Sequence, residues 1–279
     1  MELTHGFSLK FKQIQKLYQM KIGIIGTGAI GGTIAKKMVK AGHTVKISNS
    51  KQGAELNARA EELGAIASTT ENVVSDVDVV VISIPTVAIP TLPKDLFADV
   101  PENVIVVDTS NYYPFRDADI EEIKNGKVES IWVSEQLGRP VVKAFNNLLV
   151  ETLENGGKEP DAEDRIAMAV AGDDAQAKKV LAELINDAGF DTVDAGNLSE
   201  SWLHQPGTPA YCTELNSEEL KKALADGVRE DAPVKRDEAI AGLSAMKSYP
   251  SHPEVVAFNR ALFEKNPKTK KNKLTKGSI

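Results

Sequence analysis

Three glycines near the start of the chain have a spacing that suits phosphate binding. Gly26, Gly28 and Gly31 form a G-x-G-x-x-G pattern between the apolar run Lys21–Ile25 and a segment with helical periodicity. In such a unit the first glycine permits a tight turn, the second lets the backbone approach a pyrophosphate, and the third lets helix and strand pack closely. The first N–H groups of the helix would attract the same phosphates. The candidate dinucleotide contacts are Gly26, Thr27, Gly28, Ala29, Ile30 and Gly31.

The residues that end the second strand decide which dinucleotide is expected. An acidic residue there would bond the free 2′-hydroxyl of NAD, whereas a 2′-phosphate needs hydrogen-bond donors or cations. Here the strand Thr44–Ser48 ends in Ser48 and is followed by Asn49, Ser50 and Lys51. Asn and Ser are also common turn formers. At this position, however, three hydrogen-bonding side chains and one ammonium favour NADP.

The most apolar run of the chain predicts a central strand beside the glycines. Val77–Ile84 reads as a parallel strand buried on both faces. Ligands of open α/β sheets bind outside the carboxyl ends of the strands. Ser83, Ile84 and Pro85 are therefore candidate cofactor contacts, although Pro85 is also a natural strand stop.

Two further strands end in polar or aromatic residues. Asn103–Asp108 leads into Asn111 and Tyr112, and Pro140–Phe145 leads into Asn146 and Asn147. Such loops at strand ends commonly carry ligand contacts. The later segment 201–213 is irregular and contains Trp202 and His204. The candidates for a second pocket are Asn111, Tyr112, Asn147, Trp202 and His204, although core or interface packing would use the same aromatic side chains equally well.

Composition limits the classes of function. The formal net charge of -7 argues against non-specific nucleic-acid binding, and no apolar run is long enough for a membrane helix. One cysteine, Cys212, and the lack of a signal-peptide pattern favour a cytoplasmic protein. The four histidines show no metal-ligand spacing, so no metal is expected. The lysines between Lys265 and Lys276 read as a solvated tail.

Several of these segments together resemble one family. The pieces Ile47–Ser50, Asp108–Pro114, Val142–Asn146 and Gln205–Pro209 are similar to NADP oxidoreductases of the deazaflavin (coenzyme F420)-dependent type. The resemblance covers about residues 21 to 213. It implies a Rossmann domain that holds NADP, with a flavin-like ring stacked at the nicotinamide.

The resemblance also implies roles for individual residues of this chain. In the characterised reductases a Ser-Arg pair after strand two holds the 2′-phosphate, and these positions are Ser48 and Asn49 here. Asn49 departs from the pattern, and Lys51 could restore the charge without arginine's bidentate fork. The backbone of Ala144, Phe145 and Asn146 would lie near the nicotinamide. No catalytic side chain is expected, since the two rings carry the reaction.

The expected architecture is α/β: a Rossmann, doubly wound, mostly parallel sheet with a helical C-terminal appendage. The predicted parts are an N-terminal extension (1–19), an NADP-binding Rossmann domain (20–147), an α/β continuation that lines the acceptor pocket (148–213), and helices with a basic tail (214–279). The expected partner is a flavin or deazaflavin-like hydride acceptor. The helical part must bury its apolar face, which suggests a homodimer.

Two alternative functions remain open. A reductase of a small carbonyl or imine would need a positioned proton donor, and Lys143 is the only lysine at a plausible strand end. Its place inside the strand could turn its side chain away from the site. A non-enzymatic NADP-binding sensor would keep the nucleotide site and lack only the acceptor pocket.

Overall fold

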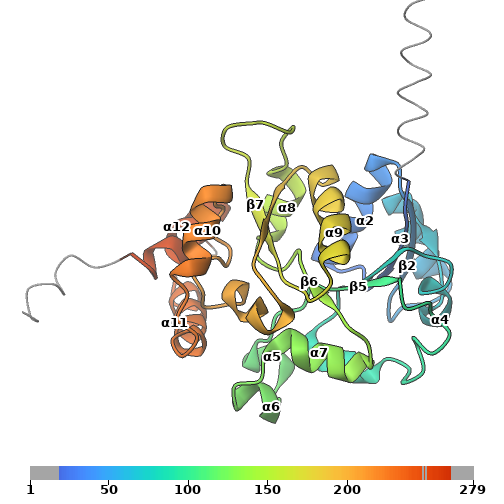
Figure 1. Ribbon diagram of the computed structural model, residues 1–279, viewed down its shortest axis with the longest axis horizontal. Helices are drawn as coiled ribbons and strands as arrows, with labels where there is room; N and C mark the ends of the chain where they lie inside the picture. Colours follow the sequence, from blue (N-terminus) through green and yellow to red (C-terminus); the bar gives the residue numbers. More distant parts are fainter. Residues whose placement is uncertain (1–18, 247, 249, 265–279) are drawn as a thin grey trace, which may run out of the picture.

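The computed structural model describes residues 19–246, 248 and 250–264. The predicted N-terminal extension, apart from Gln19, and the lysine tail lie outside these residues. Within the described part no helix is long and apolar enough to cross a membrane. The C-terminal helices, orange and red in Figure 1, lie at the opposite end of the molecule from the first two strands.

A six-stranded parallel sheet forms the centre of the fold. Its spatial order is β3-β2-β1-β4-β5-β6. The order reverses between β1 and β4, and this is where doubly wound sheets bind nucleotides. The strands are β1 (Lys21–Ile25), β2 (Thr44–Ser48), β3 (Ile66–Ala67), β4 (Val79–Ile82), β5 (Ile105–Asp108) and β6 (Val142–Lys143).

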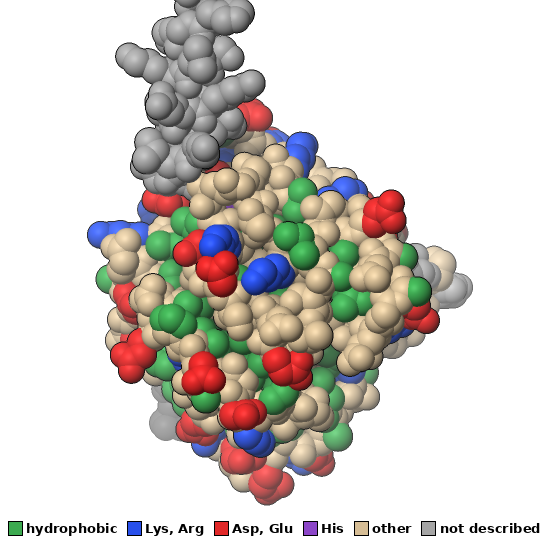
Figure 2. Space-filling model, turned by 90° about the vertical axis from the view of Figure 1, so that its right-hand side faces the viewer, with side chains coloured by type: hydrophobic (Ala, Val, Ile, Leu, Met, Phe, Trp, Pro, Cys, Tyr) green, Lys and Arg blue, Asp and Glu red, His purple; other side chains and the backbone are tan. Residues whose placement is uncertain are grey.

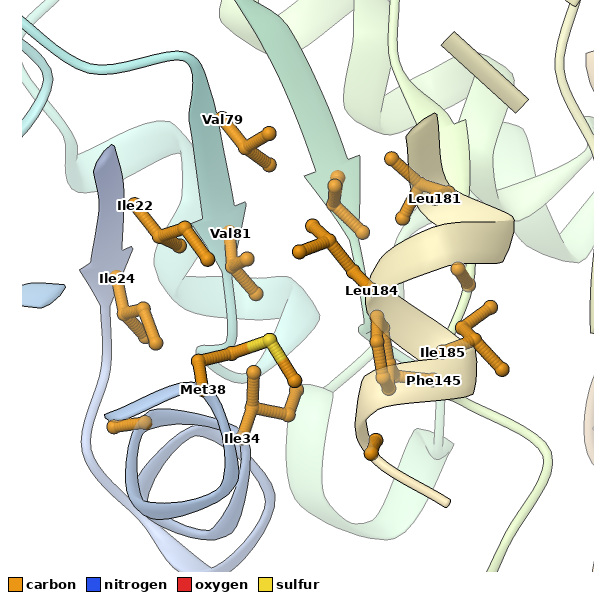
Figure 3. Packing of buried hydrophobic residues seen from close by; sticks show 14 of the residues in the cluster. Ile22, Ile24, Ile34, Met38, Val79, Val81, Phe145, Leu181, Leu184 and Ile185 are labelled. Atoms are coloured by element: carbon orange, nitrogen blue, oxygen red, sulfur yellow. The ribbon is translucent and has the colours of Figure 1, made fainter. Parts of the chain in front are cut away.

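One face of the sheet is covered by α2 (Ala29–Ala41), α3 (Ala54–Leu63) and α9 (Ala175–Asp187). Figure 3 shows how Ile34 and Met38 of α2 and Leu184 of α9 meet the sheet residues Ile24 and Val81. Side chains alternate between the faces of a strand. Val80 and Ile82 of β4 therefore enter the core on the other side, which the following helices cover: α4 (Thr70–Val73), η1 (Thr86–Thr91) and α7 (Glu129–Leu137).

The sixth strand is shorter than the sequence suggested. Strand geometry was expected over Pro140–Phe145, but β6 contains only Val142 and Lys143. Phe145 adopts a left-handed backbone conformation (φ 59°), which no strand can continue through. The Phe145 side chain packs in the core beside Ile185 (Figure 3), and Phe145 and Asn146 lie at the wall of the cleft described below.

A second, two-stranded parallel sheet follows. It contains β7 (Ala167–Val170) and β8 (Asp191–Asp194) and joins β6 through an antiparallel bridge between Lys143 and Ala171. Residues on both sides of the expected boundary at 147 contribute to one hydrophobic cluster, among them Ile24 and Leu184. Short elements complete this part: α5 (Pro114–Asp117), α6 (Glu121–Lys124), α8 (Val150–Asn155) and η2 (Leu198–His204).

The appendage contains α10 (Ser217–Ala225), α11 (Ala232–Ser244) and α12 (His252–Ala261). Side chains of α12 fasten it to the segment before α10. The Asn259 amide donates to the Cys212 carbonyl oxygen at 3.1 Å, and Arg260 donates to the carbonyl oxygens of Thr213 and Glu214, both at 2.7 Å. The predicted α/β fold with a helical C-terminal part is thus confirmed.

Candidate functional site

The glycine turn after β1 has the geometry that a dinucleotide requires. Gly26 has φ +97°, a conformation open to glycine, and its N–H donates to the Ser48 carbonyl oxygen at 2.8 Å. A Cβ on Gly31 would lie 2.0 Å from the Gly26 carbonyl oxygen, so only glycine allows this packing. A Cβ on Gly28 would meet no protein atom within 4 Å. Gly28 therefore leaves open space in front of the helix.

Helix α2 begins in that open space. Its N-cap is Gly28, and no side chain caps its first N–H groups. The first N–H groups of a helix lack intrahelical partners and attract anions. A cleft of about 1100 Å³ lies beside the turn, between α3, the end of β2 and the segment after β4. The predicted contacts Gly26, Thr27, Ser83, Ile84 and Pro85 line it.

The four residues at the end of β2, Ser48–Lys51, line the same cleft but differ in their exposure and in their hydrogen-bond partners. The Ser48 side chain is buried, and its hydroxyl bonds that of Thr70 at 3.0 Å. The Asn49 amide donates to the Thr27 hydroxyl at 2.7 Å. Ser50 is exposed on the cleft wall. Lys51 pairs with Glu55 at 2.7 Å on the surface, and this hydrogen bond raises the pKa of Lys51.

Figure 2 shows the side of the molecule that lies on the right in Figure 1, where β2, α3 and α4 are found. Acidic and basic side chains are interspersed on this face, and the blue side chains form no continuous patch. A single phosphate group bound here would consequently depend on individual donors and cations rather than on a broad positive surface.

A second compartment of about 320 Å³ continues the cleft on the other side of the glycine turn. Both compartments are lined by Gly28 and Ser83–Pro85. Phe145 and Asn146 line the second one, together with Asn111. The structure therefore brings these predicted residues together in two adjoining compartments.

A hydrogen-bond network fixes Asn146 in this compartment. Its amide donates to the Asn111 side-chain oxygen at 3.0 Å and to the His204 carbonyl oxygen at 2.8 Å. The Asn146 side-chain oxygen lies 2.8 Å from Nδ1 of His204 and can only accept, so Nδ1 carries the proton and donates it. Burial, and then the Lys143 ammonium, lower the pKa of His204 to about 3. His204 is thus a neutral support behind Asn146.

Five residues predicted to contact the nicotinamide or the acceptor do not line the cleft. Tyr112 is buried, and its hydroxyl donates to the Ala118 carbonyl oxygen at 2.9 Å. His204 is buried behind Asn146, and Ala144 is buried in the core. The others are structural as well: Asn147 donates to the Ala210 carbonyl oxygen, and Trp202 lies near Gly227. Tyr113 rather than Tyr112 lines the second compartment, because Tyr112 is packed in the core.

A pair of tyrosines, Tyr113 and Tyr211, lines the second compartment and was not identified from the sequence. The hydroxyls of Tyr113 and Tyr211 lie 2.6 Å apart, and the Arg116 guanidinium lies 5.3 Å from the Tyr113 ring centre. Burial raises the pKa of both phenols. Both tyrosines lie in segments with a functional pattern, but sequence alone gave no reason to pair residues 98 positions apart.

Lys143 points away from the cleft. Its ammonium is buried, lies 3.0 Å from the Asp108 carboxylate and donates to the Ser110 carbonyl oxygen. This pair ties β6 to β5, and neither residue lines the cleft. Among residues 19–246, 248 and 250–264 no group of three or more His, Cys, Asp or Glu side chains could hold a metal ion.

Comparisons with known proteins agree with this geometry. Residues 21–112 match the family model described as NADP oxidoreductase, coenzyme F420-dependent. The protein YjhV of Escherichia coli (strain K12) is 33% identical over 98 residues, which cover 35% of this chain and 72% of YjhV.

Solved structures share the fold. Protein SMa0349 of Sinorhizobium meliloti is 30% identical with a TM-score of 0.59, and the match covers 71% of this chain and 95% of SMa0349. A candidate F420-dependent NADP reductase of Arthrobacter sp. FB24 is 23% identical with a TM-score of 0.55, covering 64% and 86% of the two chains. The glycine turn, the strand order and these relatives lead to one conclusion: the chain belongs to the family of coenzyme F420-dependent NADP oxidoreductases, which are NAD(P)-dependent enzymes.

Proposed function

We propose that this protein binds NADPH along the cleft and passes a hydride to a flavin-like or deazaflavin acceptor in the second compartment. One observation carries the proposal. Two adjoining cavities share Gly28 and Ser83–Pro85 as lining residues, with an uncapped helix N-terminus between them, a loop without a carboxylate in the first, and Phe145 and Asn146 in the second. This sequence of features matches the order of 2′-phosphate, pyrophosphate and nicotinamide along NADPH.

The residues present fit the cofactor. The open space at Gly28 would take the pyrophosphate, and Ser48–Lys51 would take the adenosine end. Phe145 and Asn146 would hold the nicotinamide. When bound, the nicotinamide supplies the hydride. The protein would orient the two rings beside each other in the second compartment, and positioning of this kind contributes much of the rate of hydride transfer.

The tyrosine pair supports a second candidate, a small carbonyl acceptor. Reduction of a carbonyl moves a proton together with the hydride, so it needs a hydrogen-bond donor at the oxygen. The Tyr113 and Tyr211 hydroxyls stay protonated because burial raises the pKa of both. Either hydroxyl could donate to a carbonyl oxygen in this compartment.

NADPH oxidation with a panel of acceptors tests the proposal: a deazaflavin, flavins, ferric chelates and small carbonyls. We expect turnover with the deazaflavin or a flavin, and tighter binding of NADPH than of NADH. Turnover with carbonyls alone would favour the second candidate. Tight NADPH binding without turnover on any acceptor would indicate a sensor.

Tyr211→Phe separates the two chemistries. Hydride transfer between rings needs no phenol, so its rate should change by less than about threefold. Carbonyl reduction should lose on the order of 10²-fold or more in kcat, as expected for loss of an acid catalyst. Tyr112→Phe is the matched control, since its hydroxyl bonds Ala118 outside the cleft; it should affect neither reaction.

A further inference from the structure

Helix α3 contributes an arginine to the wall of the cleft. Arg59 lies about one and a half turns after the start of α3, and its side chain is 30% exposed. One terminal nitrogen donates to the Thr27 carbonyl oxygen at 3.3 Å. The guanidinium thus lies directly beside the glycine turn, although the residue is 32 positions away in sequence.

A glycine outside the G-x-G-x-x-G pattern makes room for it. A Cβ on Gly32 would lie 2.3 Å from the Arg59 terminal nitrogen and 3.4 Å from the carbon at the centre of the guanidinium. Gly32 has no role in the turn itself. The space that it leaves is filled by the arginine head group, which is held over the start of α2.

Asn49 and Lys51, the polar residues that follow β2, already have hydrogen-bond or ion-pair partners within the protein. The Asn49 amide is bound to the Thr27 hydroxyl, and its oxygen accepts from the Lys51 N–H at 2.8 Å. The Lys51 ammonium is paired with Glu55, and both side chains are about two-thirds exposed. Asn49 brings no charge, and Lys51 is a flexible point charge held on the surface.

We propose that Arg59 is the cationic ligand of the NADP 2′-phosphate and so determines the cofactor preference. This inference rests on the proposed NADPH site. Arg59, Asn49 and Thr27 together surround the point where the end of β2 meets the glycine turn. A guanidinium offers the planar fork that binds phosphate oxygens in pairs. Arg59 on α3 would thus supply the positive charge that the neutral Asn49 does not.

The salt bridge that Arg59 makes in the structure does not oppose this role. Arg59 pairs with Glu62 at 2.7 Å, and the Glu62 side chain is 66% exposed. Exposed i,i+3 pairs of this kind are weak, since water screens them. A phosphate with two negative charges and three acceptor oxygens would compete successfully for the same nitrogens.

Binding of 2′,5′-ADP and of 5′-AMP to the full chain, measured by calorimetry, tests the inference. The two probes differ only in the 2′-phosphate. We expect Arg59→Gln to weaken 2′,5′-ADP by on the order of tenfold to a hundredfold and to leave 5′-AMP unchanged. Arg59→Lys should recover part of the loss. Arg229→Gln removes the same charge from an arginine whose bond is to the Gly126 carbonyl oxygen, and should change neither affinity.

Gly32→Ala provides a second test that keeps the arginine. The new methyl group would displace the guanidinium, so 2′,5′-ADP should bind more weakly while 5′-AMP is unaffected. Equal losses for both probes in Arg59→Gln, or no loss for either, would overturn the inference. If NADPH still binds better than NADH in that variant, the proposed function stands and only the role of Arg59 fails. If the unaltered protein binds neither dinucleotide, the proposed function itself fails.

Discussion

At the scale of single residues, the cleft depends on a buried side chain that does not line it. His204 is fully buried, its Nε2 has no hydrogen-bond partner among the described residues, and its Nδ1 supports Asn146. Asn146 in turn holds Asn111 at the cleft wall. A protonated His204 would place an unpaired charge in the core beside the Lys143 ammonium.

We predict that His204 makes the protein sensitive to acid. Its folded-state pKa is about 3, well below the unfolded value of 6.5, so the native state binds fewer protons than the unfolded state. The stability it contributes is complete above pH 6.5 and is lost as the pH falls toward 3. As the pH falls from about 7.5 to about 5, the free energy of unfolding of the unaltered protein should therefore drop by about 2 kcal/mol more than that of His204→Gln.

Urea unfolding at several pH values measures this difference. The comparison with the variant is needed because Glu129 has the opposite effect on the pH dependence of stability. Burial raises the pKa of its carboxyl to about 7, so the stability that Glu129 contributes to the protein decreases as the pH rises. A difference between the two proteins that is constant with pH would show that His204 does not titrate in this way.

At the scale of elements, β1, the glycine turn and α2 form a unit in which each glycine has a separate task. Gly31 allows the helix to approach the Gly26 carbonyl oxygen, whereas Gly28 only keeps space open. The first task concerns folding, and the second concerns binding.

Alanine at these two positions should separate the tasks. Gly31→Ala forces a Cβ to 2.0 Å from a backbone oxygen and should cost about 1–3 kcal/mol or more of folding free energy. Gly28→Ala, at φ −65°, should fold with nearly unchanged stability. It should nevertheless bind NADPH about tenfold more weakly, because its methyl group occupies the pyrophosphate space. Thermal unfolding and nicotinamide fluorescence measure the two effects; equal stability losses would contradict the assignment.

At the scale of the whole molecule, the appendage packs against the segment whose residues Tyr211 and Cys212 line the second compartment. Helix α12 holds the segment Cys212–Glu214, in which Cys212 and Glu214 have positive φ values of 54° and 50°. The residue just before it, Tyr211, lines the second compartment, and its hydroxyl bonds that of Tyr113. The position of α12 thus influences the acceptor compartment from the end of the chain opposite to the glycine turn.

Asn259→Ala tests this connection. It removes a bond to the buried Cys212 carbonyl oxygen and should lower stability by about 1–3 kcal/mol. The KM for the acceptor should rise, whereas NADPH affinity should not change. The exposed Asn125→Ala is the control and should alter neither. A loss of NADPH affinity equal to the loss in acceptor binding would argue against a local effect on the second compartment.

The sequence by itself determined the central α/β fold and one end of the cleft. Strand periodicity is local, so β1 and β2 have the bounds that the pattern predicted. A glycine turn also acts over a few residues, and its place fixes the course of the cleft.

Tertiary structure alone decided which distant side chains meet there. It paired Tyr113 with Tyr211, brought Arg59 to Thr27, and ended β6 early at the left-handed Phe145. These contacts depend on how helices and loops pack after the sheet has formed, and no spacing in the chain encodes them. For the same reason Tyr112 turned out to be core: which of two adjacent aromatic rings faces the cleft is set by packing against its neighbours.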